Sequence, residues 1–445
     1  GLLRQLHVPR ERVAVKGADA RILIYILVGC LAGGQVLAAA DEYDFDVARF
    51  HKKSWEFGGF VEMKGEHFKL DPDTAASRLR FADEPGQTIN RLSGTVELEA
   101  LFRHGLLTSW ARTHSELQHD DYLGDEQSHK LYEAVVSLQP DPGRVADIGK
   151  QVARWGKGYA WNPVGFIERP KDPDDPTLSR EGYWMLRGDW IKSFSGGLQT
   201  LAVTPAFVPV AGDMNDDFGE PSYLNPAAKL YLLYQDTDLD FLFLGQGSRS
   251  ARFGLDFSRN LAANFEIHGE LAYFTENEKK ILTPTGVTTE SDAALNWLLG
   301  LRYLTPQEIT IIGEYYRNGT GYSPQELEEF SRQVHHASGS GDTGALSELK
   351  QLSKSSYGRP NPGREYLYLR GAWKEPFDLL YFTPSIISIV NLEDSSFSLT
   401  PELLYKGIRN LELRLRLKWI NGGQLTEFGE KQNDYKVEFR LRYYF

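Results

Sequence analysis

The chain has 445 residues, a net charge of −12 and 12% aromatic residues, and its mean hydropathy is −0.40. No basic tract interleaved with aromatic residues points to a nucleic-acid partner. No run of 18 or more apolar residues occurs beyond the N-terminal region, which excludes a protein that crosses a membrane with several helices. The length accommodates either two or three soluble domains or one large barrel.

Residues 1–40 have the pattern of a signal peptide. A basic start is followed by an apolar stretch, and Ala38-Ala39-Ala40 supplies the small residues of a cleavage site. A short periplasmic segment at 41–54 would then precede the first strand. Cys30, the only cysteine, would be removed with the signal peptide; in the alternative interpretation it carries the lipid of a lipoprotein. If it is removed, no disulfide and no cysteine nucleophile remain.

From about residue 55, apolar and polar residues alternate in one segment after another. Period two is typical of strands with one apolar and one polar face. We count about 18 strands, within a range of 16 to 18 set by the sequence pattern. They are expected near residues 55–68, 92–102, 106–117, 128–139, 144–155, 183–194, 197–209, 226–235, 238–246, 249–259, 262–274, 295–303, 308–316, 364–373, 379–391, 396–405, 410–420 and 434–445.

Longer segments without alternation separate some of these strands. They lie at 156–182, 210–224, 275–290 and 317–363. In the last of them, Ser323 can cap a helix that begins at Pro324, and Glu326 completes a capping box. The Gly/Ser-rich stretch at 338–344 is expected to be a flexible loop.

The end of the chain shows the strictest alternation, in Leu411–Trp419 and Tyr435–Phe445. A soluble amphipathic sheet would show the same pattern but would need a second apolar layer. In a transmembrane barrel, each Arg or Lys facing lipid at mid-bilayer costs about 2–4 kcal/mol. The charged face is therefore expected to line the lumen. The candidate lumen-lining basic residues are Arg370, Arg414, Arg416, Lys418, Lys436, Arg440 and Arg442.

Two stretches carry a resemblance to known proteins. A final strand of alternating apolar residues that ends on Phe resembles the insertion signal of bacterial outer-membrane β-barrels; in this chain it comprises Phe439, Leu441, Tyr443 and Phe445. A looser resemblance, over about 30 residues around the end of the fifth expected strand, is to Gram-negative porins and alginate-export-type channels. It is carried by Gly149-Lys150-Gln151, Trp155-Gly156 and Trp161-Asn162-Pro163.

The resemblance implies an all-β fold: a single antiparallel transmembrane β-barrel over residues 55–445, with short periplasmic turns and long extracellular loops. It implies a Gram-negative outer-membrane location, contact with membrane lipid, and recognition of the last strand by the barrel-assembly machinery. A barrel of this size leaves an aqueous lumen unless something fills it. We therefore expect a channel for passive diffusion of small polar or anionic solutes. The alternatives are an exporter of an anionic polysaccharide and a non-conducting barrel that anchors surface loops.

Segment 156–182 is the candidate constriction loop, stiffened by several prolines. The residues expected to narrow the pore are Tyr159, Trp161, Glu168, Arg169, Lys171, Asp172, Asp174 and Asp175. The alternative is an exposed acidic loop. For the basic lumen face, the alternative is a ladder of cross-strand ion pairs with acidic neighbours. The sequence leaves the oligomeric state open.

Catalytic and metal-binding interpretations have little support. No HExxH, phosphate-binding loop or GxSxG turn occurs. Some outer-membrane barrels are hydrolases with catalytic residues near the outer rim. In this chain the candidates for such a site are His114 and Asp120, which are expected just past a strand end. Asp213, Asp216 and Asp217 could hold Ca²⁺ through oxygen ligands, although such clusters are more often solvated. We predict no enzyme activity, no cofactor and no metal.

Overall fold

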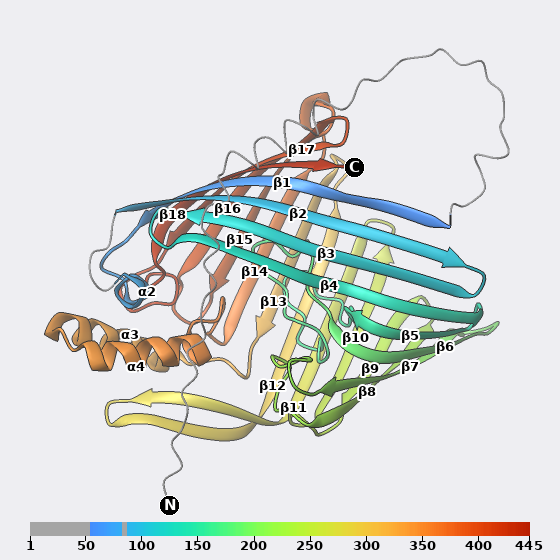
Figure 1. Ribbon diagram of the computed structural model, residues 1–445, viewed down its shortest axis with the longest axis horizontal. Helices are drawn as coiled ribbons and strands as arrows, with labels where there is room; N and C mark the ends of the chain where they lie inside the picture. Colours follow the sequence, from blue (N-terminus) through green and yellow to red (C-terminus); the bar gives the residue numbers. More distant parts are fainter. Residues whose placement is uncertain (1–53, 82–86) are drawn as a thin grey trace, which may run out of the picture. The chain divides into compact units, whose positions relative to one another are not determined.

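The computed structural model describes residues 54–81 and 87–445 (Figure 1). Within these ranges, 18 strands form a single sheet. Each strand pairs antiparallel with the next one along the chain, and β18 pairs back with β1, for example Leu441 with Met63. The sheet therefore closes, and the prediction of one antiparallel barrel of about 18 strands is confirmed. The expected signal peptide with Cys30, and almost all of segment 41–54, lie outside the described residues.

Most of the strand bounds agree with the sequence pattern to within a few residues. They are β1 (Trp55–Leu70), β2 (Thr88–His104), β3 (Leu107–Asp120), β4 (Gly124–Asp141), β5 (Arg144–Gln151), β6 (Tyr183–Ser193), β7 (Leu198–Val210), β8 (Tyr223–Tyr234), β9 (Thr237–Leu244), β10 (Arg252–Ala262), β11 (Phe265–Thr283), β12 (Gly286–Leu304), β13 (Ile309–Arg317), β14 (Glu365–Trp373), β15 (Phe382–Asn391), β16 (Phe397–Ile408), β17 (Leu411–Asn421) and β18 (Asn433–Tyr444).

The two faces of the barrel wall have opposite character. On β18, Phe439 is 50% exposed, whereas its neighbours Glu438 and Arg440 are 2% and 5% exposed. Leu415 and Leu417 on β17 are exposed in the same way, with Arg416 buried between them. Successive side chains of a strand point to opposite faces, so the apolar face is on the outside and the charged face is on the inside. A water-soluble barrel would have the reverse arrangement.

The two ends of the barrel also differ. At one end the strands are joined by short links, such as Gln235-Asp236 between β8 and β9. Both of these residues have positive φ, 47° and 60°, as a two-residue hairpin turn requires to match the twist of its strands. At the other end lie long links, including 152–182, 318–364 and 422–432. This asymmetry matches the predicted short turns and long loops.

The helix predicted after Ser323 is present as α3 (Pro324–Ser340), with both halves of its capping box formed. The prediction of a flexible stretch at 338–344 is wrong. Gly341 ends α3 in the left-handed conformation, and Asp342 caps the next helix, α4 (Thr343–Leu352), so two helix signals share the Gly/Ser-rich stretch. α4 continues into a π-helical turn, η2 (Ser353–Tyr357). A short helix in the β1–β2 link, α2 (Ala75–Arg80), was not predicted.

The loop expected at 275–290 is a hairpin instead. β11 and β12 continue past the predicted ends as paired strands and turn at residues 284–285. The charged sequence of this stretch suggested a loop, but α3 and η2 cover its apolar side chains: Leu282 is buried with Phe330 and Tyr357. Tertiary packing thus overrides the local pattern. Among the described residues, no helix is both long enough and apolar enough to span a membrane.

Candidate functional site

Segment 152–182, which links β5 to β6, contains every residue predicted for the constriction. β5 ends at Gln151 rather than near Trp155, and Arg154 turns the backbone out of the strand with a left-handed φ of 57°. The segment then contacts inward-facing side chains on β9, β11, β13, β17 and β18. Because these strands lie far apart around the barrel, the segment extends across the interior. We call it the crossing loop.

Apolar packing holds the first half of the crossing loop. Trp155, Phe166 and Ile167 are almost completely buried, in a cluster that includes inward-facing Val208 of β7 and Ala272 of β11. The inner wall is therefore apolar where it meets the loop, which a wall facing only water would not require. Burial of each large apolar side chain contributes about 1.5–3 kcal/mol, so this contact fixes the base of the loop.

A buried carboxylate on β11 holds the next turn. Oε1 of Glu270 accepts hydrogen bonds from the backbone N–H groups of Lys157 and Gly158, both at 2.6 Å, and Oε2 accepts one from Val164 at 3.2 Å. Gly156 in this turn has a φ of 95°, and a Cβ atom there would lie 2.7 Å from Glu270 Oε1. Glycine is thus required for the close approach of the loop to the wall.

A second carboxylate and an aromatic cluster extend this attachment. Glu314 on β13 accepts hydrogen bonds from the backbone N–H groups of Tyr159 and, at 2.9 Å, Ala160. The Trp161 ring stacks on Tyr316 with 5.0 Å between centroids. The Tyr159 hydroxyl donates to Glu266 on β11 at 3.2 Å. Tyr159 and Trp161 therefore anchor the loop to the β11–β14 side of the barrel.

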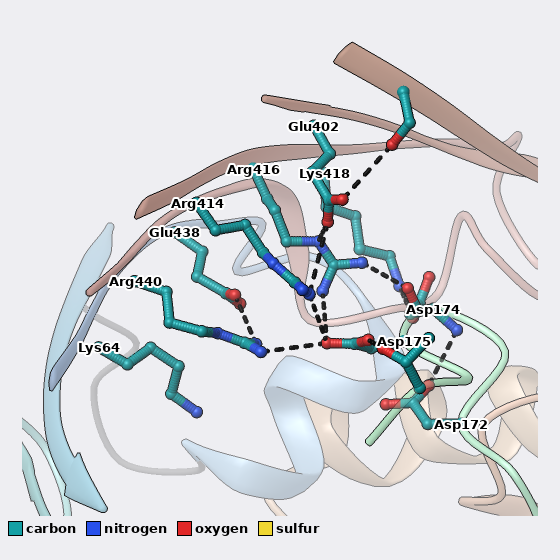
Figure 2. Close-up of polar contacts among 12 residues, drawn as sticks. Lys64, Asp172, Asp174, Asp175, Glu402, Arg414, Arg416, Lys418, Glu438 and Arg440 are labelled. Atoms are coloured by element: carbon teal, nitrogen blue, oxygen red, sulfur yellow. Dashed lines mark hydrogen bonds and ion pairs between the residues drawn. The ribbon is translucent and has the colours of Figure 1, made fainter. Parts of the chain in front are cut away.

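The acidic second half of the loop meets the opposite, basic wall (Figure 2). Three guanidinium groups converge on Oδ2 of Asp175, with Nη1 of Arg440, Arg414 and Arg416 at 3.2, 3.3 and 3.5 Å. Lys418 pairs with the Asp174 carboxylate. The structure thus brings predicted loop residues against predicted lumen residues, and their opposite charges explain the contact.

The basic wall also has acidic partners of its own. Arg416 pairs with Glu402 of β16 at 3.1 Å, and Arg440 pairs with Glu438 at 2.8 Å. Lys436, Arg414 and Arg442 have comparable partners in Glu66, Glu412 and Glu62. The ladder of ion pairs expected under the alternative interpretation is therefore present. Arg370 on β14 has no ion pair within the described residues.

The remaining predicted loop residues hold the loop itself together. Glu168 pairs with Arg180 at 2.9 Å, and the Arg169 guanidinium binds both Asp217 and the Glu181 carbonyl. Lys171 donates to the Gly158 carbonyl. These residues lie among loop segments rather than against the basic wall. Asp217, one of the acids considered as a possible calcium ligand, pairs with Arg169.

The pKa values of the three aspartates in the crossing loop are shifted in different directions. Removal from bulk water works against the Asp175 charge, but Arg416, Arg414 and Arg440 hold its pKa below the ordinary value. The same opposition operates at Asp174, where Lys418 lowers the pKa. For Asp172, burial and the neighbouring Asp174 carboxylate both raise the pKa. Among these three aspartates, Asp172 is thus the one that takes up a proton first as the pH falls.

A cavity of about 330 Å³, lined mostly by charged residues, remains between the crossing loop and the wall. Its volume lies in the range of small-molecule sites. Charged groups of both signs line it. The cations are Lys64, Arg91, Arg416, Lys418, Lys436 and Arg440, and the anions are Glu66, Asp172, Asp174, Asp175 and Glu438.

Three of the long links at the same end of the barrel, which we call the outer links, meet at Glu430. They are the β1–β2, β13–β14 and β17–β18 links, and Glu430 lies in the last of them. Its carboxylate accepts hydrogen bonds from Ala75 N at 2.6 Å and Leu425 N at 2.8 Å, and lies 3.0 Å from Nε2 of His335 on α3. Apolar residues of α2, α3 and α4 form one cluster around this contact. His335 thus joins neighbouring loops, and His336 is exposed. In the described part of the chain, no group of three or more His, Cys, Asp or Glu is placed to hold a metal ion.

The sequence did not single out Glu314, Glu402 or Glu430. Glu314 and Glu402 occupy inward positions of period-two strands, and that periodicity is the signal that could have identified them. His114, expected past a strand end, lies within β3 and contacts Glu97 at 3.3 Å. Asp120 is fully buried and pairs with Arg91 at 3.0 Å. These two residues are therefore engaged separately with the wall.

No protein-family model matches the chain, and no curated protein is found to be similar to it. Among solved structures, OprD of Pseudomonas aeruginosa matches with 9% identity and a TM-score of 0.47, over 88% of this chain and 95% of OprD. OccK2 (OpdF) of the same organism, in complex with glucuronate, matches with 12% identity and a TM-score of 0.49, over 88% and 97%. A triple mutant of the Rhodopseudomonas blastica porin matches with 10% identity and a TM-score of 0.42, over 88% and 100%. At this level of similarity, the activities of those proteins do not transfer to this chain.

Proposed function

We propose that the chain is an outer-membrane channel for passive diffusion of small polar or charged solutes, and that the crossing loop is its constriction. The outer surface supports a membrane location. It exposes leucines, valines and isoleucines between two rings of aromatic residues. The ring at the short-link end includes Trp55, Trp190 and Tyr303, and the ring at the other end includes Tyr273, Trp419 and Tyr435. Aromatic girdles around an apolar band are typical of barrels in lipid.

The observation that carries the channel function is the charged contact between the crossing loop and the basic wall. It supports the proposal because ionic groups of both signs line a cavity of about 330 Å³ inside a barrel whose outside is apolar. Such groups can discriminate among solutes. The near balance of charge favours small solutes over a long anionic chain. A polysaccharide exporter would require an unpaired basic strip, whereas most of these cations have acidic partners.

Single-channel recording of the refolded protein tests this proposal. Steady conductance in planar bilayers, with a reversal potential in a KCl gradient that changes when Asp175 is replaced, is the expected result. Deletion of residues 170–179 should increase conductance if the loop is the constriction. Complete absence of conductance in both the parent and the deletion variant would contradict a channel and favour a barrel that anchors surface loops.

We also propose that the last strand is the element that the assembly machinery recognises. Phe439, Leu441 and Phe445 belong to the outward face of the chain's last strand segment, and Phe445 is 54% exposed. An aromatic side chain that contributes little to packing inside the barrel remains available for recognition before insertion.

A further inference from the structure

The link between β14 and β15, residues 374–381, differs from the other links at its end of the barrel. It is twice as long as the next longest, 194–197 and 305–308. It also exposes large apolar side chains: Phe377 is 82% exposed, Leu380 63% and Tyr381 57%. Exposed apolar groups on a soluble loop are unfavourable in water, so a cluster of this kind indicates a contact surface.

The backbone of the link is arranged to present these side chains. Glu375, Phe377, Asp378 and Tyr381 all have φ between 49° and 63°, a region that non-glycine residues rarely adopt. Hydrogen bonds hold this conformation: Glu375 N donates to Phe382 O at 2.9 Å, and Tyr381 N donates to Glu375 Oε1 at 2.8 Å. A strained but well-bonded turn points to a function for its shape.

The direction of the turn follows from its neighbour on β14. Trp373 lies four residues after Leu369, which is 46% exposed on the outer face, and a strand places such residues on the same face. The Phe377 ring lies 5.1 Å from the Trp373 ring. The turn therefore leans towards the outer, apolar surface of the barrel rather than into the lumen, and its apolar side chains continue that surface.

We propose that residues 374–381 form an interfacial foot that inserts into the boundary between headgroups and acyl chains of the periplasmic leaflet. The occupant is phospholipid, because the exposed residues extend the lipid-facing band and combine apolar side chains with flanking Lys374, Glu375 and Asp378. Such a mixture suits the interface, where aromatic residues sit at headgroup depth. The inference rests on the membrane location in the proposed function.

The test attaches a polarity-sensitive fluorophore to single cysteines in the full chain carrying Cys30→Ser, reconstituted in phosphatidylcholine vesicles. The test position is Phe377→Cys. Leu380→Cys is the second test position if the first variant does not fold. Leu415→Cys reports the mid-barrel band, and Pro142→Cys reports an ordinary short link at the same end. The expected result is loss of fluorescence at 377 with lipids spin-labelled near the headgroup, together with protection from aqueous iodide.

The controls separate the possible failures. Iodide quenching at position 377 as strong as at position 142, together with quenching at position 415 by spin-labelled lipid, would contradict insertion of residues 374–381. The membrane location would then still stand. If Leu415 is also not quenched by lipid, the membrane location itself is wrong. Protection of position 377 from both quenchers, with chemical cross-linking between chains through that cysteine, would show a second copy as the occupant and would overturn the lipid assignment.

Discussion

Oδ2 of Asp175 lies 3.2 Å from Nη1 of Arg440, although 265 residues separate the two in the chain. One end of this contact is on the crossing loop, and the other is on the strand that closes the barrel against β1. This contact can therefore form only when β18 is in place. The charged face of β18 receives the loop, and in the proposed membrane location it also keeps these charges away from lipid.

Asp175→Asn should loosen the crossing loop and shift selectivity towards anions. Removal of one member of a buried ion pair typically costs about 3–5 kcal/mol, and in this variant three guanidinium groups lose the same carboxylate. We expect larger, noisier single-channel currents and a reversal potential displaced towards the anion value. Asp213→Asn, on an exposed outer link, is the matched control and should behave like the parent. Identical reversal potentials in Asp175→Asn and the parent would exclude Asp175 from the conducting path.

Glu270→Ala should detach the other side of the crossing loop. The carboxylate accepts three backbone hydrogen bonds, and bonds to a charged group contribute about 1.5–3 kcal/mol each. The barrel itself should persist, since strand pairing does not depend on this side chain. We expect increased conductance. The difference in electrophoretic mobility between heated and unheated protein, which reports the folded barrel, should be unchanged. Glu290→Ala, exposed on β12 outside this contact, is the control; equal conductance in both variants would show that Glu270 does not position the loop.

The strands could be predicted from the sequence because their signal is local. On β17 and β18, alternation and the cost of charge in lipid together predicted which residues face the lumen. The route of the crossing loop could not be predicted, since it depends on partners such as Glu270 and Arg440 that are distant in sequence. Glu402 carried no separate signal, because an inward-facing acid has the same sequence pattern whether it is solvated or paired. The β11–β12 hairpin was missed because α3 and η2, not its own composition, hold it.

Acidification should act in two stages. The pKa of Asp172 is raised above its ordinary value of 3.8. Among the three aspartates of the loop it is therefore protonated first, and selectivity should shift towards anions before the contact of Asp174 and Asp175 with the basic wall is lost. The pKa values of Asp174 and Asp175 are lowered. Their contribution to docking is therefore present above pH 3.8 and is lost only as the pH falls through the lower values.

Reversal potential and conductance recorded from neutral pH down to about pH 2 resolve these stages, since ordinary aspartates titrate at about pH 3.9, inside that range. Asp172→Asn should remove the early change in selectivity and keep the later rise in conductance. A rise in conductance that precedes the change in selectivity would contradict the protonation of Asp172 before Asp174 and Asp175.

Phe445→Ala should slow assembly in cells without destabilising the folded barrel. Its side chain is exposed and contributes little buried area, so the free energy of unfolding in detergent should change by less than about 0.5 kcal/mol, as for other surface substitutions. Quantitative blotting of outer-membrane fractions should show reduced amounts. Leu415→Ala, equally outward but distant from the chain end, is the control; an equal reduction in both variants would indicate a general loss of lipid contact.

Glu430→Ala should separate the three outer links that meet at its carboxylate. The substitution leaves the N–H groups of Ala75 and Leu425 and the imidazole of His335 without their acceptor. An unsatisfied buried donor costs about 1–3 kcal/mol, and 1.4 kcal/mol corresponds to about tenfold in an equilibrium constant. Trypsin should therefore cut the outer links, at Arg78 or Arg332, at least about tenfold faster in membranes. Glu348→Ala on the exposed face of α4 should leave the rate unchanged. Equal cleavage of Glu430→Ala and the parent would mean that the apolar cluster of α2, α3 and α4 holds the links together without this carboxylate.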